Sequence, residues 1–412
     1  MKKGLNMNRG TENVGTNNQG QRCKRAHIRV AHERTMKNGK IVYIKAVIVN
    51  KELFDFEKLS IKERVKYCLY FSAPINNVEY TNPKPTTQIL RAGTAFSGIG
   101  APEWALKQLG IEHTNEFMVE IDTNARKTYL ANFTPKQTFE DITKIDYNTL
   151  DDIDIFFFGS PCQSFSMQGK RCGLEDTRGT LVYNGLQIIK AKQPKYFVYE
   201  NVKGMLNHDK GNTFNVIKSA FEELNYTIQY KVLNAKHYGS PQNRERLFIV
   251  GIRKDIKQTF KFPQPLSYIP CVNDIIKMDE PITDNLLLDT TSIVPKEPNP
   301  KTDIKIMAEF SNLRYASDKR ICSTQGISPC LTKGGSKTRF YDTKHNVYRR
   351  LSEKELSRIQ GFGDEYVFPV ANTHIKEQLG NSMAVQVMQS LLKNLVPHLL
   401  PNIQEETLIQ AA

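Results

Sequence analysis

The sequence has 412 residues, of which 39% are hydrophobic and 24% are charged, and this is ordinary usage for a globular protein. The composition excludes a fibrous or wholly disordered chain, and the length predicts two or three domains. Lysine and arginine number 57 against 43 aspartates and glutamates, so the net charge of +14 favours a polyanionic partner, nucleic acid before membrane.

Targeting signals and cysteine spacing indicate the cellular location of the protein and whether it holds disulfides or a metal. No apolar run is long enough to span a bilayer, and the N-terminus lacks the apolar core of a secretory signal. We therefore expect a cytoplasmic protein without membrane contact. The seven cysteines are scattered without a Cys-x-x-Cys pair, which predicts neither a disulfide framework nor a metal site.

Residues 1–87 are predicted to form a basic N-terminal extension. Residues 1–50 contain eleven lysines and arginines against two acidic residues, which is typical of a mobile arm. Between residues 27 and 49, alternating apolar residues flank Asn38-Gly39, and this pattern predicts a β-hairpin. A short helix and a Pro-rich linker are expected to complete the extension.

From about residue 88, short apolar runs alternate with amphipathic helices. Strands are expected at 89–95, 117–120, 153–158, 196–200 and 247–252, and helices from Ala101, Asp122 and Thr180 and over 213–224. This order predicts a doubly wound, Rossmann-like α/β fold whose largely parallel sheet is covered on both faces. Such sheets bind ligands at the carboxyl ends of their strands.

The alternation stops at about residue 255. Residues 272–313 are acidic and interrupted by prolines, whereas 314–344 hold seven lysines and arginines against two acidic residues. We infer a second, smaller domain. Helical periodicity returns at 353–359 and 384–395.

A glycine-containing turn follows the first strand of the sheet. Gly98 and Gly100 would let a ligand approach the backbone at a helix N-terminus. Glu120 stands at the end of the second strand, where an acid accepts bonds from ribose hydroxyls. Glu103 replaces the third glycine of a dinucleotide fingerprint, and an acid there would repel a pyrophosphate. We therefore expect a nucleoside ligand, although a tight turn beside an ordinary surface acid is the alternative.

Chemically reactive side chains follow later strands of the same sheet. Cys162 lies in a polar loop of small residues, 159–166, which would place its thiol at the carboxyl edge, where a nucleophile belongs. Most isolated cysteines are inert small hydrophobes, but this one has polar neighbours. Glu200 ends the next strand. Arg244 and Arg246 would face the same side before the last strand and suit an anionic or carbonyl-bearing substrate. Together these groups suggest group transfer to a nucleobase.

The motifs occur in the order seen in DNA (cytosine-5)-methyltransferases, a family that the chain resembles over residues 89–395. They are Phe96-x-Gly98-x-Gly100, Gly159-Ser160-Pro161-Cys162-Gln163, Glu200-Asn201-Val202, Gln242-x-Arg244-x-Arg246, Arg350-Leu351-Ser352, Gln360-Gly361-Phe362 and Gly380-Asn381-Ser382. The resemblance implies an enzyme of the bacterial or phage restriction-modification type that methylates cytosine in a specific double-stranded DNA sequence.

The resemblance also implies a role for each reactive side chain. Cys162 would add to carbon 6 of cytosine, so that carbon 5 can attack the methyl group of S-adenosylmethionine. Glu200 would hydrogen-bond ring nitrogen 3 and the exocyclic amine, and Arg244 and Arg246 would position the base. The cytosine must leave the duplex to reach the site, at a cost of roughly a few kcal/mol.

By the same resemblance, eleven residues would bind S-adenosylmethionine. They are Phe96, Gly98, Gly100, Glu120, Ile121, Asp141, Ile142, Pro161, Leu181, Asn381 and Ser382. Ile121 stands where the family often has an aromatic residue. The catalytic domain would be discontinuous, comprising 88–254 and 376–400, with a target-recognition domain at 255–375.

Within the recognition domain, the basic cluster Lys333, Lys337 and Arg339 is the candidate DNA-contacting group. A solvated loop is the alternative for any one of these residues. Family analogy makes a cognate restriction endonuclease conceivable, and we expect a monomer. Alternatives for the whole chain are a tRNA cytosine-5 methyltransferase, a catalytically silent DNA-binding homologue and a nicotinamide-dependent oxidoreductase.

Overall fold

The computed structural model describes residues 89–161, 181–333 and 338–399, together with the backbone of short strands between residues 15 and 49. The chain divides into two compact units, residues 1–80 and 81–412. Cys162, Lys337, and the short helix and linker expected before residue 88 lie outside the described residues. Among the described helices, none combines the length and the apolar character that a membrane span requires.

The first unit contains short antiparallel strand pairs. They are β1 (Gly15–Thr16) with β2 (Arg22–Cys23), β3 (His27–Arg29) with β6 (Val47–Val49), and β4 (His32–Thr35) with β5 (Ile41–Ile44). The last two pairs confirm the hairpin expected between residues 27 and 49. In the register of the β4–β5 pair, His32 lies opposite Ile44 and Thr35 opposite Ile41.

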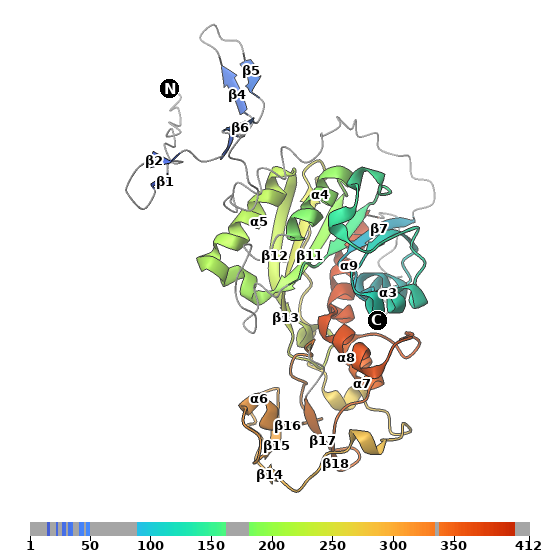
Figure 1. Ribbon diagram of the computed structural model, residues 1–412. Coiled ribbons are helices and arrows are strands. Elements are labelled where there is room, and N and C mark those ends of the chain that lie inside the picture. The colour runs from blue at the N-terminus through green and yellow to red at the C-terminus, as the bar shows by residue number, and fades with distance from the viewer. Residues whose placement is uncertain are drawn as a thin grey trace. The chain divides into compact units, whose positions relative to one another are not determined.

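The second unit is built on a seven-stranded sheet of order β12-β13-β11-β10-β7-β8-β9 (Figure 1). Its strands are β7 (Leu90–Ala95), β8 (His113–Val119), β9 (Gln137–Phe139), β10 (Ile155–Phe158), β11 (Tyr196–Val202), β12 (Tyr226–Asn234) and β13 (Glu245–Arg253). The pairs from β11 across to β9 are parallel, whereas β13 runs antiparallel to both of its neighbours. The largely parallel sheet is therefore confirmed.

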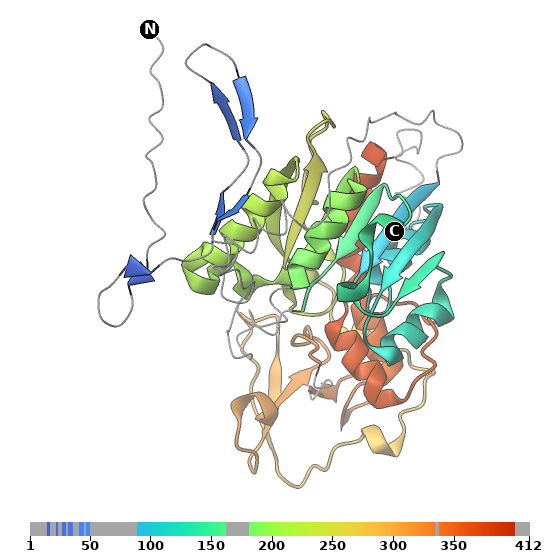
Figure 2. The ribbon, with the colours of Figure 1, turned by 45° about the horizontal axis from the view of Figure 1, so that its top comes forward.

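Helices cover both faces of this sheet (Figure 2). They are α2 (Ala101–Gln108), α3 (Thr123–Asn132), α4 (Val182–Lys192), α5 (Asn212–Glu223) and α9 (Val385–Leu399). Successive side chains of β10 point to opposite faces of the sheet. Phe157 belongs to the core on the face covered by α2, α3 and α9, while Phe158 packs against Phe221 of α5 on the other face. This is the doubly wound, Rossmann-like arrangement that the sequence predicted.

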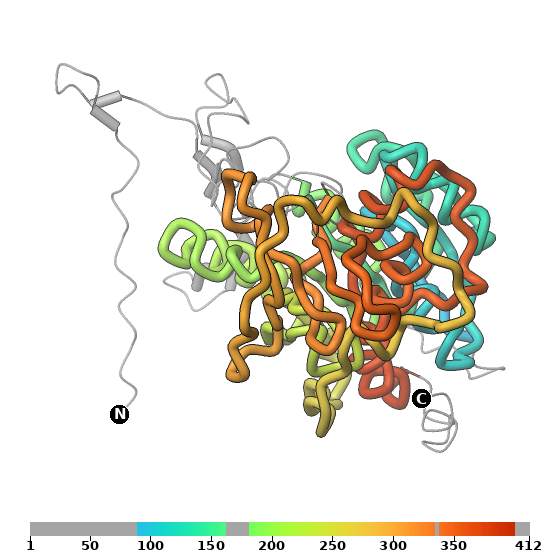
Figure 3. Tube along the Cα trace, turned by 90° about the horizontal axis from the view of Figure 1, so that it is seen from below, coloured from blue at the N-terminus to red at the C-terminus, as the bar shows by residue number. Residues whose placement is uncertain are grey.

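A second, smaller sheet follows β13 in the chain, with order β14-β15-β16-β17-β18. Its strands are β14 (Ile293–Pro295), β15 (Ile306–Phe310), β16 (Arg320–Ser323), β17 (Arg339–Asp342) and β18 (Val347–Arg349). The short helix α6 (Ala316–Lys319) precedes β16, and α7 (Glu353–Gln360) and α8 (Asn372–Asn381) lead back to α9. Figure 3 follows this excursion and return along the chain trace.

Short 3₁₀ segments connect these elements. They are η3 (Ile142–Lys144), η4 (Tyr147–Thr149), η7 (Lys203–Gly211), η8 (Ala235–Tyr238), η9 (Val272–Ile275) and η10 (Asp284–Leu286).

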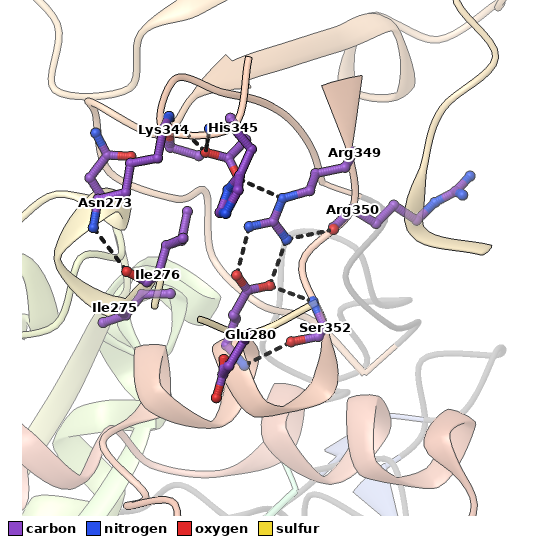
Figure 4. Close-up of polar contacts among 12 residues, drawn as sticks. Asn273, Ile275, Ile276, Glu280, Lys344, His345, Arg349, Arg350 and Ser352 are labelled. Carbon is purple, nitrogen blue, oxygen red and sulfur yellow. Dashed lines mark hydrogen bonds and ion pairs between the residues drawn. The ribbon is translucent and has the colours of Figure 1, made fainter. Parts of the chain in front are cut away.

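A buried ion network joins the smaller sheet to α7. Arg349 donates to Asp342 at 2.7 Å and, through two nitrogens, to Glu355 at 2.7 Å each. Figure 4 shows Arg349 reaching from its strand toward the helix that begins beside Ser352. Burial alone would lower the pKa of Arg349, but the two carboxylates outweigh burial and raise it. The guanidinium therefore stays charged and ties β18 to the first turn of α7.

Candidate active site

A cavity of about 380 Å³ opens at the carboxyl ends of the parallel strands. Eleven of the predicted site residues line it: Phe96, Gly98, Glu120, Ile121, Pro161, Glu200, Arg244, Arg246, Lys333, Asn381 and Ser382. These residues come from both predicted segments of the catalytic domain and from the smaller domain between them. The volume suits a small organic ligand.

The turn after β7 is shaped to receive such a ligand. Phe96, Gly98 and Gly100 all adopt positive φ, at 54°, 55° and 76°. The Gly98 N–H donates to Glu120 Oε2 at 2.8 Å, and the Asp122 N–H donates to Glu120 Oε1 at 2.9 Å. Two backbone donors thus hold the Glu120 carboxyl at the cavity wall, and burial raises its pKa.

Gly100 serves packing at this turn. A Cβ there would lie 2.4 Å from the Phe133 ring, so only glycine permits the close approach of the turn to α3. Asp141 instead caps η3 through the Thr143 N–H at 3.0 Å. Like Gly100, Asp141, Ile142 and Leu181 are not among the residues that line the cavity. A cofactor contact for these four residues stays a prediction.

Glu103 does not face the ligand side of the turn, contrary to the reasoning from the sequence. It is 1% exposed and accepts hydrogen bonds from Thr94 Oγ1 at 2.8 Å and Tyr129 Oη at 2.6 Å. Its Oε2 has no hydrogen-bond partner among the residues that the structure describes, and burial raises the pKa of the carboxyl. Because a buried acid cannot repel a ligand that it does not meet, the argument against a pyrophosphate from Glu103 was wrong.

Glu200 and Arg246 form an ion pair inside the cavity. Arg246 Nε lies 3.1 Å from Glu200 Oε1, and the side chains are 19% and 13% exposed. Gly159 leaves room for this pair, since a Cβ there would lie 3.3 Å from both Glu200 Oε2 and Met383 Cε. Pro161 also lines the cavity, so the chain leads from this wall directly into Cys162.

Arg244 lines the cavity, and its terminal nitrogens hydrogen-bond to backbone carbonyls of the protein. Its two terminal nitrogens donate to the carbonyls of Leu331 at 3.0 Å, Gly380 at 3.2 Å and Ser382 at 2.6 Å. Burial, and then the charge of Arg246, lowers its pKa. The predicted contact of Arg244 with the base stays a prediction, and its hydrogen bonds to Leu331, Gly380 and Ser382 were not indicated by the sequence pattern.

Two of the three predicted DNA-contacting residues, Lys333 and Arg339, line different cavities, and Lys337 lies outside the described residues. Lys333 lies in the main cavity, whereas Arg339 lines a separate cavity of about 230 Å³ with Arg350. Arg339 sits 5.1 Å from the centre of the Phe310 ring and donates to the Asp318 carbonyl. A DNA contact by these residues stays a prediction.

Sequence reasoning missed several residues at the cavity. His374, Glu377 and Met383 line it, and Cys330 Sγ lies 3.5 Å from Arg244 Nη1 and 3.9 Å from Arg246 Nη2. The position of Cys330 beside both arginines follows from tertiary packing, and no local pattern signals it. Within the described ranges, no group of three or more histidine, cysteine or acidic residues could hold a metal ion.

The family follows from comparison with known proteins. A model described as C-5 cytosine-specific DNA methylase matches residues 91–397. The chain belongs to this family. As a C-5 cytosine-specific DNA methylase of the restriction-modification type, it is a DNA (cytosine-5)-methyltransferase.

Curated relatives of this methylase cover most of its length. The type II methyltransferase M.SsoII of Shigella sonnei is 38% identical, covering 73% of this chain and 78% of its own. M.HhaI of Haemophilus parahaemolyticus is 35% identical, with 74% and 94% covered. A solved structure of Spodoptera frugiperda DNMT2 has a TM-score of 0.58 at 22% identity, covering 74% of this chain and 99% of that one, which supports the fold.

Proposed function

We propose that this methylase transfers a methyl group from S-adenosylmethionine to carbon 5 of cytosine in a specific double-stranded DNA sequence. The transfer runs through a covalent adduct between Cys162 and a flipped-out base. The observation that carries the proposal is the Glu200–Arg246 pair, held at 3.1 Å in the cavity wall from which the chain enters Cys162.

Cys162, Glu200 and Arg246 each have a different role toward the base. The Cys162 thiolate forms a bond to carbon 6, and the ring electrons displaced by this addition make carbon 5 nucleophilic. Glu200 hydrogen-bonds ring nitrogen 3 and the exocyclic amine, and Arg246 holds the base beside it. After methyl transfer, loss of the proton at carbon 5 expels Cys162 and restores the aromatic ring.

The cavity fits the proposed methyl donor. S-adenosylmethionine supplies an electrophilic methyl group and carries a ribose whose hydroxyls need acceptors. The Glu120 carboxyl, fixed by the Gly98 and Asp122 N–H groups, provides them at the cavity wall. Asn381 and Ser382, which return to the same cavity from α8, would also contact the donor.

Base flipping and DNA contact complete the proposal. The cost of unstacking a cytosine, roughly a few kcal/mol, must be offset by phosphate and groove contacts. Lys333 supplies one positive charge at the cavity. We place the protein in the cytoplasm as a monomer, with a cognate endonuclease as a possible partner. An RNA substrate is disfavoured because the matching family is one of DNA methylases.

Expression in cells without DNA methylation tests the proposal. Wild type and Cys162→Ala are produced at equal soluble levels, and 5-methylcytosine is mapped across the genome. We expect methylation at one short sequence motif with wild type and none with the variant. Soluble wild type that leaves no mark would refute the DNA substrate and favour a catalytically silent role, whereas methylation by Cys162→Ala would refute the covalent step.

A further inference from the structure

Two segments distant in the chain meet in the wall of the cavity. The recognition loop, defined here as residues 326–333, belongs to the smaller domain, and the cofactor segment, residues 380–382, ends α8. A Cβ on Gly380 would lie only 2.2 Å from the Thr332 carbonyl oxygen. The two backbones therefore touch, and glycine at position 380 is what permits the contact.

A chain of hydrogen bonds runs from the recognition loop to the cofactor segment. The Leu331 N–H donates to Gln242 Oε1 at 2.9 Å, and Gln242 Nε2 donates to Gln360 Oε1 at 2.9 Å. Gln360 Nε2 then donates to the Ser382 carbonyl at 3.2 Å and to the Leu379 carbonyl. Both glutamines are 0% exposed, so water cannot replace a bond that is lost.

Arg244 spans the same gap in parallel. It donates to the Leu331 carbonyl at 3.0 Å and to the Ser382 carbonyl at 2.6 Å. Leu331 and Ser382 are thus tied twice, once through the two glutamines and once through the arginine. Displacement of either segment alone would leave buried polar groups without partners, so the two segments share one geometry.

We propose that Gln242 and Gln360 are positioning residues that couple DNA reading by the recognition loop to cofactor binding by the cofactor segment. This inference rests on the function proposed above. A ligand that orders one segment also orders the other, so the second ligand meets a smaller entropic cost. Specific DNA and cofactor therefore tighten each other's binding by the same factor.

The coupling factor is the ratio of the S-adenosylhomocysteine dissociation constants measured without and with a short duplex that carries the mapped sequence. A scrambled duplex sets the baseline. For wild type we expect a factor of at least about five. For Gln242→Met and Gln360→Met we expect the factor to fall by about twofold or more, since only the Arg244 tie remains, while affinity for S-adenosylhomocysteine alone changes by less than about threefold.

The double variant separates coupling from general destabilisation. Because the two glutamines act in series, Gln242→Met/Gln360→Met should lose no more coupling than either single change, whereas independent destabilisation would add. Gln386→Met is the matched control, because Gln386 Nε2 donates to the Arg358 and Ile359 carbonyls of α7, which belong to neither segment. This variant should keep the wild-type factor.

The outcomes distinguish this inference from the proposed function. Wild type that methylates cytosine but shows a factor of one, or single variants that retain the wild-type factor, would overturn the coupling alone. Wild type that neither methylates DNA nor binds S-adenosylhomocysteine would overturn the proposed function. Should Gln242→Met fail to fold, Gln242→Glu replaces it in the test. This variant keeps an acceptor for the Leu331 N–H but cannot donate to Gln360, so we expect the same loss of coupling.

Discussion

The Glu200 carboxylate and the Arg246 guanidinium lie 3.1 Å apart, and both side chains are largely buried. This contact fixes the orientation of both side chains in the cavity wall. In the proposed mechanism, this geometry presents the acid to a pyrimidine edge, with the arginine beside it.

Glu200→Gln should slow methyl transfer by about 10²–10⁴-fold, because the amide cannot share a proton with ring nitrogen 3 as the carboxyl does. Single-turnover methylation of a labelled duplex measures the effect. Glu245→Gln is the matched control, since Glu245 pairs with Lys203 at 3.1 Å on the surface. A rate for Glu200→Gln within about twofold of the control would remove Glu200 from the chemistry.

Lys333→Glu should weaken DNA binding and reduce the slope of log affinity against log salt by about one, because one phosphate contact is lost. Fluorescence anisotropy at several salt concentrations gives both quantities. Lys107→Glu, on the exposed side of α2 and outside the cavity wall, should leave the slope unchanged. An unchanged slope for Lys333→Glu would place this residue away from the phosphates.

Glu355→Ala should destabilise the protein by about 3–5 kcal/mol, because Arg349 would remain as a buried charge with one partner fewer. Urea unfolding followed by fluorescence measures the loss. The control lies on the same turn of α7: Glu353 pairs with Lys376 at 2.8 Å in a more exposed setting, and Glu353→Ala should cost about 1 kcal/mol or less. Equal losses of stability in the two variants would mean that the buried ion network contributes no more than a partly exposed ion pair.

Glu103→Gln should make the protein more stable than wild type as the pH rises. Burial raises the pKa of Glu103 above 4.5, so its neutral form favours folding below that pH, and this contribution is lost as the pH rises through the folded-state value. The advantage of the variant should grow by about 1.4 kcal/mol per pH unit over that window. Unfolding curves across the pH range test this, with the exposed Glu112→Gln as control. A pH-independent difference would show that Glu103 is charged when folded.

Much of the catalytic sheet was predictable because its buried strands are continuous apolar runs, as in Ile155–Phe158. The strand Tyr226–Asn234 was missed, since it lies at the edge and only its ends carry fully buried apolar residues. The helix Asn372–Asn381 was missed because buried positions in it are few and mixed with polar ones. Edge strands and partly polar helices depend on tertiary packing more than on pattern.

The candidate site was predictable to the extent that local motifs carry it. Glu120, Glu200 and Arg246 reach the cavity because each ends or begins a strand at the same edge. The side chain of Glu103 points toward Thr94 and Tyr129, and its position three residues after Gly100 did not predict this orientation. The role of Arg244 depends on carbonyls contributed by segments more than 80 residues away in the chain.

The position of α9 has a consequence for synthesis on the ribosome. This helix packs against α2, and Trp104 and Leu395 belong to the same buried core. Residues 385–399 leave the ribosome only after residues 255–384, so the part of α2 that α9 covers stays exposed during that interval. The growing chain must keep this apolar surface from aggregating until α9 packs against it.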